Sequence, residues 1–378
     1  MGRIVDDSVP YMNRDMRARE LAYQTVFTGV TERKPRWKEC TDAVSGFLSS
    51  GIGALYVKNY FSEEAKTNAV KTITDIKKQL AKTLRQVEWM DETTRARALE
   101  KLTAISSVVA YSDEILKVDK LEKYYESLEL SGENYLESFV NCTLFESNKM
   151  FGRLHNPVKK NDWTGQSPAV VNAFYSPFEN SIEIPAGILQ GIFFSDDRPK
   201  YTNYGGIGFV IGHEITHGFD QVGSTFDKDG NLADWWATTT KENFVQRARC
   251  VIQQYGNYTV EEVELQLDGK MTVNENIADN GGIKAAYLAY GDWVLENQPE
   301  KQLPGLNYTS NQMFWISAAN GWCTKYTKET LRQMVATDTH SPAEWRIVGS
   351  LSNTPQFSKD FNCPIGSKMN PIDKCSVW

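Results

Sequence analysis

Residues 205–219 have the sequence GGIGFVIGHEITHGF, and this stretch decides the fold. The two glycines at its start permit close packing against a neighbour, and we expect a helix over 205–219. His213 and His217 are four residues apart, so a helix places both rings on one face, one turn from each other. The other faces of this helix are apolar, which predicts that it is buried.

Two buried imidazoles with this spacing are typical of a zinc site. An unpaired polar group in the interior costs free energy, and a metal ion is a partner that serves both His213 and His217. Zinc prefers neutral imidazole nitrogens and takes a third protein ligand, which leaves one position for water in a catalytic site. Glu214 can then act on that water as a general base. The pentapeptide alone also fits two histidines that bind no metal.

The third ligand is expected on another element, a helix predicted over 273–296. Glu275 is the best candidate, and Asp279 lies four residues later on the same helix face. One of these carboxylates can bind the metal while the other orients a ligand histidine. Asp220, three residues after His217, can likewise accept a hydrogen bond from the ligand ring. Without this context, such a carboxylate pair is usually a solvated pair on a surface helix.

The length of 378 residues suggests two lobes, and the pattern predicts a mainly α protein with a small β-sheet, an α+β fold. Apolar residues at helical spacing, with Ser62 and Asp91 as candidate N-caps, indicate that the first half is helical. The predicted helices cover 63–89, a segment after Asp91 through Leu102, 118–130, 133–153, 310–326, 328–336 and 342–351. The predicted strands cover 169–175 and 181–184, and the C-terminal tail is expected to be irregular.

The composition excludes some classes of function. The net charge is −7 and there are no basic runs, which argues against nucleic-acid binding. No apolar run approaches the roughly 18 residues that span a bilayer, and the N-terminus has no apolar core of a signal peptide. Six cysteines without a CxxC pair and three glycosylation sequons, at Asn141, Asn257 and Asn307, nevertheless favour an oxidising compartment.

Several further stretches make the chain resemble the neprilysin and endothelin-converting enzyme family of zinc peptidases. The matching stretches occur in family order and at family spacing. They are VNAFY at 171–175, PAGILQ at 185–190, NYGGIG at 203–208, HEITHGFD at 213–220, DWW at 234–236, ENIADNGG at 275–282, THSP at 339–342 and CSVW at 375–378. The resemblance implies a thermolysin-like zincin catalytic lobe over residues 96–378, and a remnant of a helical lid lobe over residues 1–95.

The resemblance also implies roles for individual residues, and with them a zinc-dependent endopeptidase that hydrolyses small peptides. The zinc ligands, for one ion per chain, would be His213, His217 and Glu275. The catalytic residues would be Glu214 as the base, Asp279 as the support of a ligand histidine, and His340 as the group that stabilises the oxyanion. Asp220 would hold the other ligand histidine, and the substrate would be bound by Asn172, Ala173 and Arg346.

The family prefers a large hydrophobic residue just after the cleaved bond. The side chains that would form the corresponding pocket are Ile188, Phe193, Phe209, Val210 and Trp322. For each of them, a place in the core is an equally good interpretation. The substrate strand is expected to add to an edge strand near Asn172, because main-chain hydrogen bonds bind an extended peptide independently of its sequence.

The resemblance covers only the C-terminal half of family members, which begin with a cytosolic tail and a membrane-spanning helix. We therefore expect a fragment, an incomplete gene model or a truncated paralogue. Its full-length form would be a cell-surface or secreted ectodomain, joined to a membrane only through an upstream segment. An alternative is a catalytically inactive protein that binds peptides or acts as a decoy. The oligomeric state stays open.

Six cysteines allow 15 pairings, and the residues themselves do not choose among them. By resemblance, Cys250 pairs with Cys375 inside this chain. Cys40, Cys323 and Cys363 match cysteines whose partners belong to the other half of the family's sequence. Cys142 has no family counterpart.

Overall fold

The computed structural model describes residues 8–157 and 167–378, which form two compact units interleaved along the sequence. Unit 1 consists of Met1–Phe61, Tyr111–Val170 and Tyr326–Gln333. Unit 2 consists of Ser62–Ala110, Val171–Lys325 and Met334–Trp378. Within unit 2, α5 (Glu63–Gln86) packs on α10 (Phe209–His217) and α12 (Val273–Glu296).

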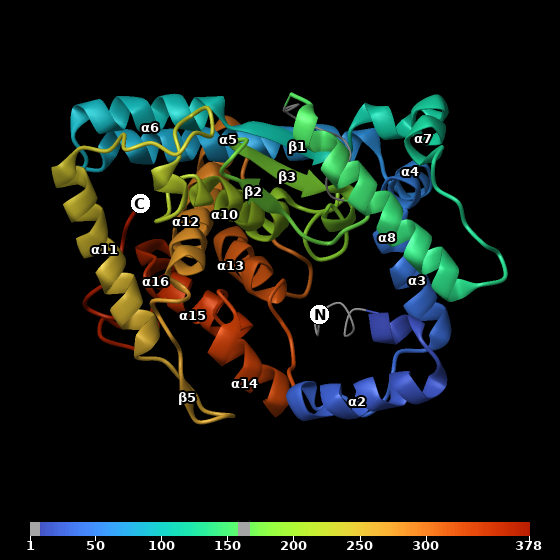
Figure 1. The fold of residues 1–378 in the computed structure, drawn as a ribbon. Coiled ribbons are helices and arrows are strands. Elements are labelled where there is room, and N and C mark those ends of the chain that lie inside the picture. Colours follow the sequence, from blue (N-terminus) through green and yellow to red (C-terminus); the bar gives the residue numbers. More distant parts are fainter. Residues whose placement is uncertain (1–7, 158–166) are drawn as a thin grey trace. The chain divides into compact units, whose positions relative to one another are not determined.

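Unit 1 is built from helices. They are α2 (Arg14–Thr28), α3 (Arg36–Phe47), α4 (Ser49–Tyr60), α7 (Val118–Tyr125) and α8 (Tyr135–Gly152), and they appear in blue and green in Figure 1. Three of them, α2, α3 and α7, bury no residue completely. The helix predicted over 118–130 is α7, which ends at residue 125. The helix predicted over 133–153 is confirmed as α8.

Unit 2 contains the remaining long helices and both sheets. Its helices include α5, α6 (Glu92–Ala104), α9 (Lys200–Asn203), α10 (Phe209–His217), α11 (Thr238–Gly256), α12 (Val273–Glu296), α13 (Ser310–Asn320), α15 (Ala343–Ser352) and α16 (Pro355–Asp360). The helix α14 (Lys328–Thr337) has residues in both units. Ser62 and Asp91 cap α5 and α6 as predicted, because each side chain accepts a hydrogen bond from the third backbone N–H.

The central helices α10 and α12 pack face to face in unit 2 (Figure 1). The helix predicted over 273–296 is confirmed to the residue as α12. The helix predicted over 205–219 begins as one turn of π-helix, Tyr204–Gly208, and continues as α10 to His217. The π turn lies against α13, where a Cβ on Gly205 would collide with the carbonyl oxygen of Phe314.

A three-stranded sheet covers one side of α10, in the order β1 (Ser106–Ala110), β3 (Ser181–Pro185), β2 (Phe174–Ser176). β1 and β3 are parallel, β2 and β3 are antiparallel, and β2 is therefore an edge strand. Ile182 and Ile184 are fully buried. A second sheet pairs β4 (Thr259–Val260) with β5 (Leu265–Gln266).

Some predicted elements were wrong or were missed. Residues 169–173 are not a strand, because the Asn172 side chain accepts the backbone N–H of Ala173, which a strand would offer to its neighbour. The helix predicted over 310–326 ends at Asn320. The elements β1 and α11 were not predicted, and the tail contains the short helix α16 instead of being wholly irregular.

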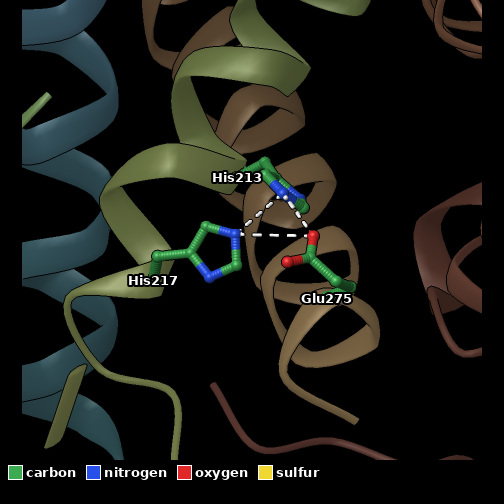
Figure 2. A group of neighbouring side chains, drawn as sticks. All are labelled: His213, His217 and Glu275. Atoms are coloured by element: carbon green, nitrogen blue, oxygen red, sulfur yellow. Dashed lines mark hydrogen bonds and ion pairs between the residues drawn. The ribbon is translucent and has the colours of Figure 1, made fainter. Parts of the chain in front are cut away.

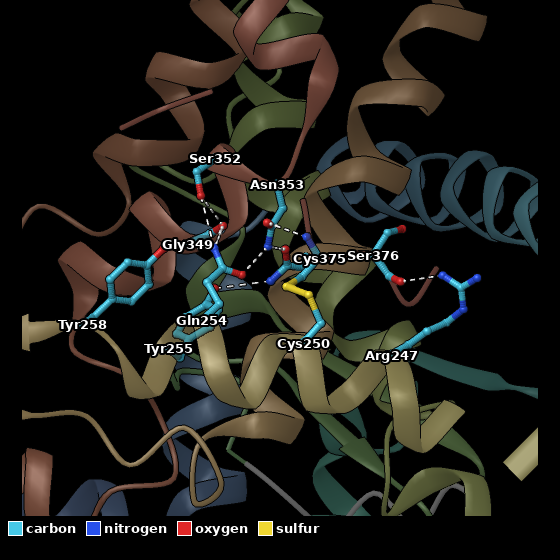
Figure 3. The surroundings of a disulfide bond; sticks show 11 residues. Arg247, Cys250, Gln254, Tyr255, Tyr258, Gly349, Ser352, Asn353, Cys375 and Ser376 are labelled. Atoms are coloured by element: carbon cyan, nitrogen blue, oxygen red, sulfur yellow. Dashed lines mark hydrogen bonds between the residues drawn. A yellow bond between two sulfur atoms is a disulfide. The ribbon is translucent and has the colours of Figure 1, made fainter. Parts of the chain in front are cut away.

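One disulfide joins α11 to the C-terminal segment. Cys250 is bonded to Cys375, as the resemblance implied, and Figure 3 shows the polar side chains around the bond. Asn353 links the two sides, since its amide donates to Gln254 and its carbonyl oxygen accepts the backbone N–H of Cys375. The other four cysteines, Cys40, Cys142, Cys323 and Cys363, are free. Within the described residues, no helix combines the length and the apolar character that crossing a membrane requires.

Candidate metal centre and active-site cleft

The site begins with the close approach of α10 and α12. A Cβ on Gly212 would lie 2.5 Å from the carbonyl oxygen of Gly282, and a Cβ on Gly282 would collide with the backbone nitrogen of His213. Only glycine at both positions lets the two backbones touch. This contact sets Glu275 and Asp279, which precede Gly282 on α12, against His213 on α10.

Three candidate ligand atoms converge at this contact (Figure 2). His213 Nε2 lies 3.0 Å from His217 Nε2 and 3.1 Å from Glu275 Oε2, and His217 Nε2 lies 3.5 Å from Glu275 Oε2. Zinc–ligand bonds are about 2.0–2.2 Å, so the edges of a zinc tetrahedron measure roughly 3.3–3.6 Å. The three atoms are thus spaced as the ligands of one small metal ion.

Glu275 provides a second test of this fit. Its Oε2 atom is buried and makes no hydrogen bond, although three histidine Nε2 atoms face it. Burial alone would raise the pKa of Glu275, but the interactions with His213, His217 and His340 hold that pKa well below its usual range. A buried carboxylate oxygen that faces three imidazole Nε2 atoms, without a hydrogen bond to any of them, has the properties of a metal ligand.

The His213 ring is held by a carboxylate that is itself ion-paired. Asp279 is completely buried, and its Oδ1 lies 2.9 Å from His213 Nδ1. Arg346 on α15 donates to the same carboxylate twice, from Nε at 2.8 Å and from Nη2 at 2.7 Å. Burial alone would raise the pKa of Asp279, but the charge of Arg346 lowers it. The Arg346 guanidinium also lies 3.9 Å from the centre of the Trp322 ring.

The His217 ring is held differently. Its Nδ1 lies 2.7 Å from Oδ2 of Asp220, a residue that is 3% exposed. The other oxygen, Oδ1, accepts the backbone N–H groups of Val222 and Gly223 at 2.8 and 2.7 Å. The structure therefore brings Asp220 to the position that the sequence suggested. A neutral ring that gives its Nδ1 hydrogen to a carboxylate keeps its Nε2 lone pair for a metal.

Glu214 and His340 flank the candidate ligands. Glu214 follows His213 on α10 and lines the cleft, and it is 7% exposed. His340 Nε2 lies 3.1 Å from Glu275 Oε2, and its Nδ1 lies 2.9 Å from Asp338 Oδ1. Asp338 also accepts the backbone N–H of His340, which fixes the short segment before α15.

A cleft of about 670 Å³ opens in front of these groups, and all of its lining residues belong to unit 2. The five apolar side chains named from the sequence all line it: Ile188, Phe193, Phe209, Val210 and Trp322. Asn172 and Ala173 lie on the cleft wall directly before β2, and Arg346 lies there with its Nε and Nη2 atoms engaged by Asp279. The cleft combines an apolar wall with a few polar groups, as ligand sites usually do.

Some cleft and supporting residues were missed in the sequence. Val222, Met271 and Asn274 line the cleft, and Asn274 accepts the backbone N–H of Gln221. Asp338 was missed too, although an acidic residue two positions before a histidine is a recognisable local pattern. For Met271 and Val222 the sequence carries no comparable signal.

Comparison with known proteins identifies the family of this chain. The family models of peptidase family M13 match residues 172–377 and, in an N-terminal part, residues 1–112. Neprilysin-2 of Drosophila melanogaster is 47% identical over all of this chain and half of its own length. Endothelin-converting enzyme 1 of Rattus norvegicus is 41% identical over 97% of this chain and 47% of its own length.

Solved structures show the same likeness. The zinc metalloprotease ZMP1 of Mycobacterium tuberculosis, in complex with an inhibitor, superposes with a TM-score of 0.84 at 31% identity. That match covers 96% of this chain and 54% of the ZMP1 chain, so the chain spans about half the length of the relatives that it matches. The mainly helical zincin fold is thereby confirmed. On the match over residues 172–377, the chain belongs to peptidase family M13.

Proposed function

We propose that this chain is the catalytic part of a zinc-dependent endopeptidase that hydrolyses short peptides. The observation that carries the proposal is the set of three candidate ligand atoms, 3.0–3.5 Å apart, beside Glu214 at the end of an apolar cleft. The proposed ligands are His213, His217 and Glu275, for one zinc ion. A bound zinc ion supplies a water molecule of lowered pKa and polarises the carbonyl of the substrate.

The residues around the ligands have separate roles in the reaction. Glu214 takes a proton from the attacking water and later gives it to the leaving amine, so that each cleavage consumes one water molecule. His340 points its Nε2 toward the candidate ligands, where it can stabilise the oxyanion of the tetrahedral intermediate. Asp338 fixes the orientation of that ring. Asp279 and Asp220 hold the ligand histidines in the tautomer that leaves Nε2 free for the metal.

The peptide is proposed to bind in extended form along β2. An edge strand has unpaired main-chain groups, and a substrate can complete the sheet there. Asn172 and Ala173 precede this strand on the cleft wall, and Arg346 lies on the wall as a candidate donor to a substrate carbonyl. The five apolar side chains that line the cleft, Ile188 and Trp322 among them, favour a large hydrophobic residue after the cleaved bond.

An extracellular setting is proposed for the full-length protein. The Cys250–Cys375 disulfide is stable in an oxidising compartment. Two of the three sequon asparagines, Asn257 and Asn307, are exposed, as a glycan requires. Small peptides are the proposed partners, and the charge of −7 still argues against nucleic acid.

The test is cleavage of a quenched fluorescent peptide, together with a measurement of bound zinc. The wild-type chain should bind one zinc and cleave the peptide, and a chelator should abolish the cleavage. Glu214→Gln should keep the zinc and lose about 10²–10⁴-fold in kcat, because the general base is gone. Glu242→Gln, an exposed carboxylate on α11, is the matched control and should behave as wild type.

The outcomes separate the two candidate functions. If Glu214→Gln retains full activity with zinc bound, the proposed base is wrong. If the wild-type chain binds zinc and peptide without turnover, it is a non-catalytic peptide binder.

A further inference from the structure

Lys101 is a buried cation that the proposed reaction does not use. It lies on α6 and is 0% exposed. Its Nζ donates to the backbone carbonyl oxygens of Gly223 at 2.6 Å and Phe226 at 2.8 Å. The same ammonium lies 5.8 Å from the centre of the Phe219 ring and 5.9 Å from that of Trp235. A lysine is almost never fully buried without a specific partner, so this position needs a physical reason.

The two carbonyls belong to the segment that follows α10, residues 218–226. The same segment wraps around Asp220, whose Oδ1 accepts the N–H groups of Val222 and Gly223. Gly223 thus bonds to Asp220 through its N–H and to Lys101 through its carbonyl oxygen. A side chain at this position would collide with the carbonyl oxygen of His217, so the segment packs closely against the end of α10. Lys101 thereby fixes the backbone that presents Asp220 to His217.

The backbone of Lys101 makes a second connection, toward the cleft wall. Its carbonyl oxygen accepts a hydrogen bond from the Asn180 amide at 3.2 Å. Asn180 in turn accepts the hydroxyl of Tyr175, which belongs to the edge strand β2. Lys101 therefore contacts both the 218–226 segment and Asn180, the residue that is hydrogen-bonded to Tyr175 on β2.

Stability alone does not explain a lysine here. Moving an ammonium out of water costs several kcal/mol, and an apolar side chain of similar volume is often as good or better in a core. Asp220 and Asp227 lie near enough for their charges to favour the protonated ammonium, although neither forms an ion pair with it among the described contacts. What offsets this cost is that the ammonium donates to two main-chain carbonyl oxygens, and both lie in the 218–226 segment.

We propose that Lys101 is a positioning residue for the metal centre. It holds the 218–226 segment in place before any metal binds, so that Asp220 meets the Nδ1 hydrogen of His217 and the ring presents Nε2. The inference rests on the proposed zinc site, which the zinc content of the wild-type chain tests separately.

The first test uses the wild-type protein. Hydrogen–deuterium exchange is measured for peptides that cover residues 218–226, with zinc and after its removal by a chelator. The segment should stay protected in the metal-free protein, because Lys101 and not the metal holds it. If removal of zinc alone brings exchange in this segment to the rate of an exposed loop, the proposal is overturned. This measurement needs no variant, and a wild-type chain that takes up no zinc must still show the segment protected.

The second test uses variants and competition with a chelator to measure zinc affinity. Lys101→Met keeps the aliphatic stem and removes the donors, and it should weaken zinc binding by about tenfold, at the lower end of what lost support of a metal ligand causes. Lys77→Met is the matched control, since Lys77 also donates to a main-chain carbonyl, that of Ile105, outside the 218–226 segment. It should leave the affinity within about twofold of wild type.

A double-mutant cycle shows whether Lys101 acts through Asp220. Asp220→Asn alone should weaken zinc binding by about 10–100-fold. Adding Lys101→Met to it should weaken binding no more than about twofold further, because the two changes break the same support. Fully additive losses, or unchanged affinity in a folded Lys101→Met protein, would contradict the proposal. Lys101→Gln keeps a neutral amide donor group without the charge, and it replaces the Met variant if that one does not fold.

Discussion

The two ligand histidines are held by different interactions, although behind each of them lie first a carboxylate and then a buried cation. Behind His213, Asp279 and Arg346 form a two-point ion pair between the helices α12 and α15. Behind His217, Asp220 is held by main-chain N–H groups, and Lys101 reaches the same backbone through two carbonyls. The first support depends on charge balance and the second on the shape of a loop.

This difference shows in the two cations. Burial lowers the pKa of Arg346, but the adjacent Asp279 charge more than offsets this and raises it. Burial lowers the pKa of Lys101 to about 8, because the charges of Asp220 and Asp227 only partly compensate. Arg346 is thus locked in its charged form, while Lys101 can lose its proton within an accessible pH range. Each support should therefore respond to a different perturbation.

The largest effect on stability is expected when Arg346, the counter-charge of Asp279, is removed. Arg346→Met leaves Asp279 completely buried without its counter-charge, and the free energy of unfolding should fall by about 3–5 kcal/mol. Urea unfolding measures it, with Arg332→Met as the control, since Arg332 is half-exposed and pairs weakly with Glu329. The control should change stability by less than about 1 kcal/mol. A loss below about 1 kcal/mol for Arg346→Met would mean that the ion pair is not the support of His213.

The next effect concerns the carboxylates themselves. Asp279→Asn and Asp220→Asn should each weaken zinc binding by about 10–100-fold, as measured by competition with a chelator. Asp279→Asn should have the larger effect, because Arg346 Nη2 already lies 3.4 Å from His213 Nδ1 and loses its partner. Asp220→Asn keeps one oxygen for Val222 and Gly223. A reversed order would show that the loop, and not the ion pair, is the stronger support.

The smallest effect is a pH dependence that belongs to the His217 side alone. Between about pH 8 and its usual value of 10.5, Lys101 is protonated in the unfolded chain and neutral in the folded one. The unfolded state then binds more protons, so this group makes the protein more stable as pH rises through the window. Lys101→Met should lack that rise. Urea unfolding of both proteins at pH 7.5, 8.5 and 9.5, roughly one-unit steps across the window, measures this rise. If the free energy of unfolding changes with pH equally in both proteins, the pKa of Lys101 is not lowered.

The parts of the site that follow helical spacing were predictable from the sequence. His213, His217, Glu275 and Asp279 lie on two helices, where a separation of four residues fixes a common face. The bounds of α12 matched the prediction, and its buried residues, which lie between Val273 and Tyr290, extend over most of its 24 residues. Asp220 was found because it lies only three residues beyond His217.

The parts that depend on contacts distant in sequence were not predictable. Lys101 meets Gly223 across 122 positions, and a lysine on a helix normally faces solvent. The strand β1 forms because it pairs with β3, which lies 75 positions later, and its own residues show no clear alternation. The segment 169–173 has a strand composition, but the Asn172 side chain takes the hydrogen bond that a strand would need.

The Cys250–Cys375 bond makes a covalent ring of the chain between these residues, and the ring includes Glu275, His340 and Arg346. A protease that cut once inside the ring would leave one molecule, with both pieces still tethered. The nicked chain would run as a single band on a denaturing gel until a reductant separated the pieces. Because the tether keeps the Glu275 helix at high effective concentration beside the two histidines, such nicking can leave the centre assembled.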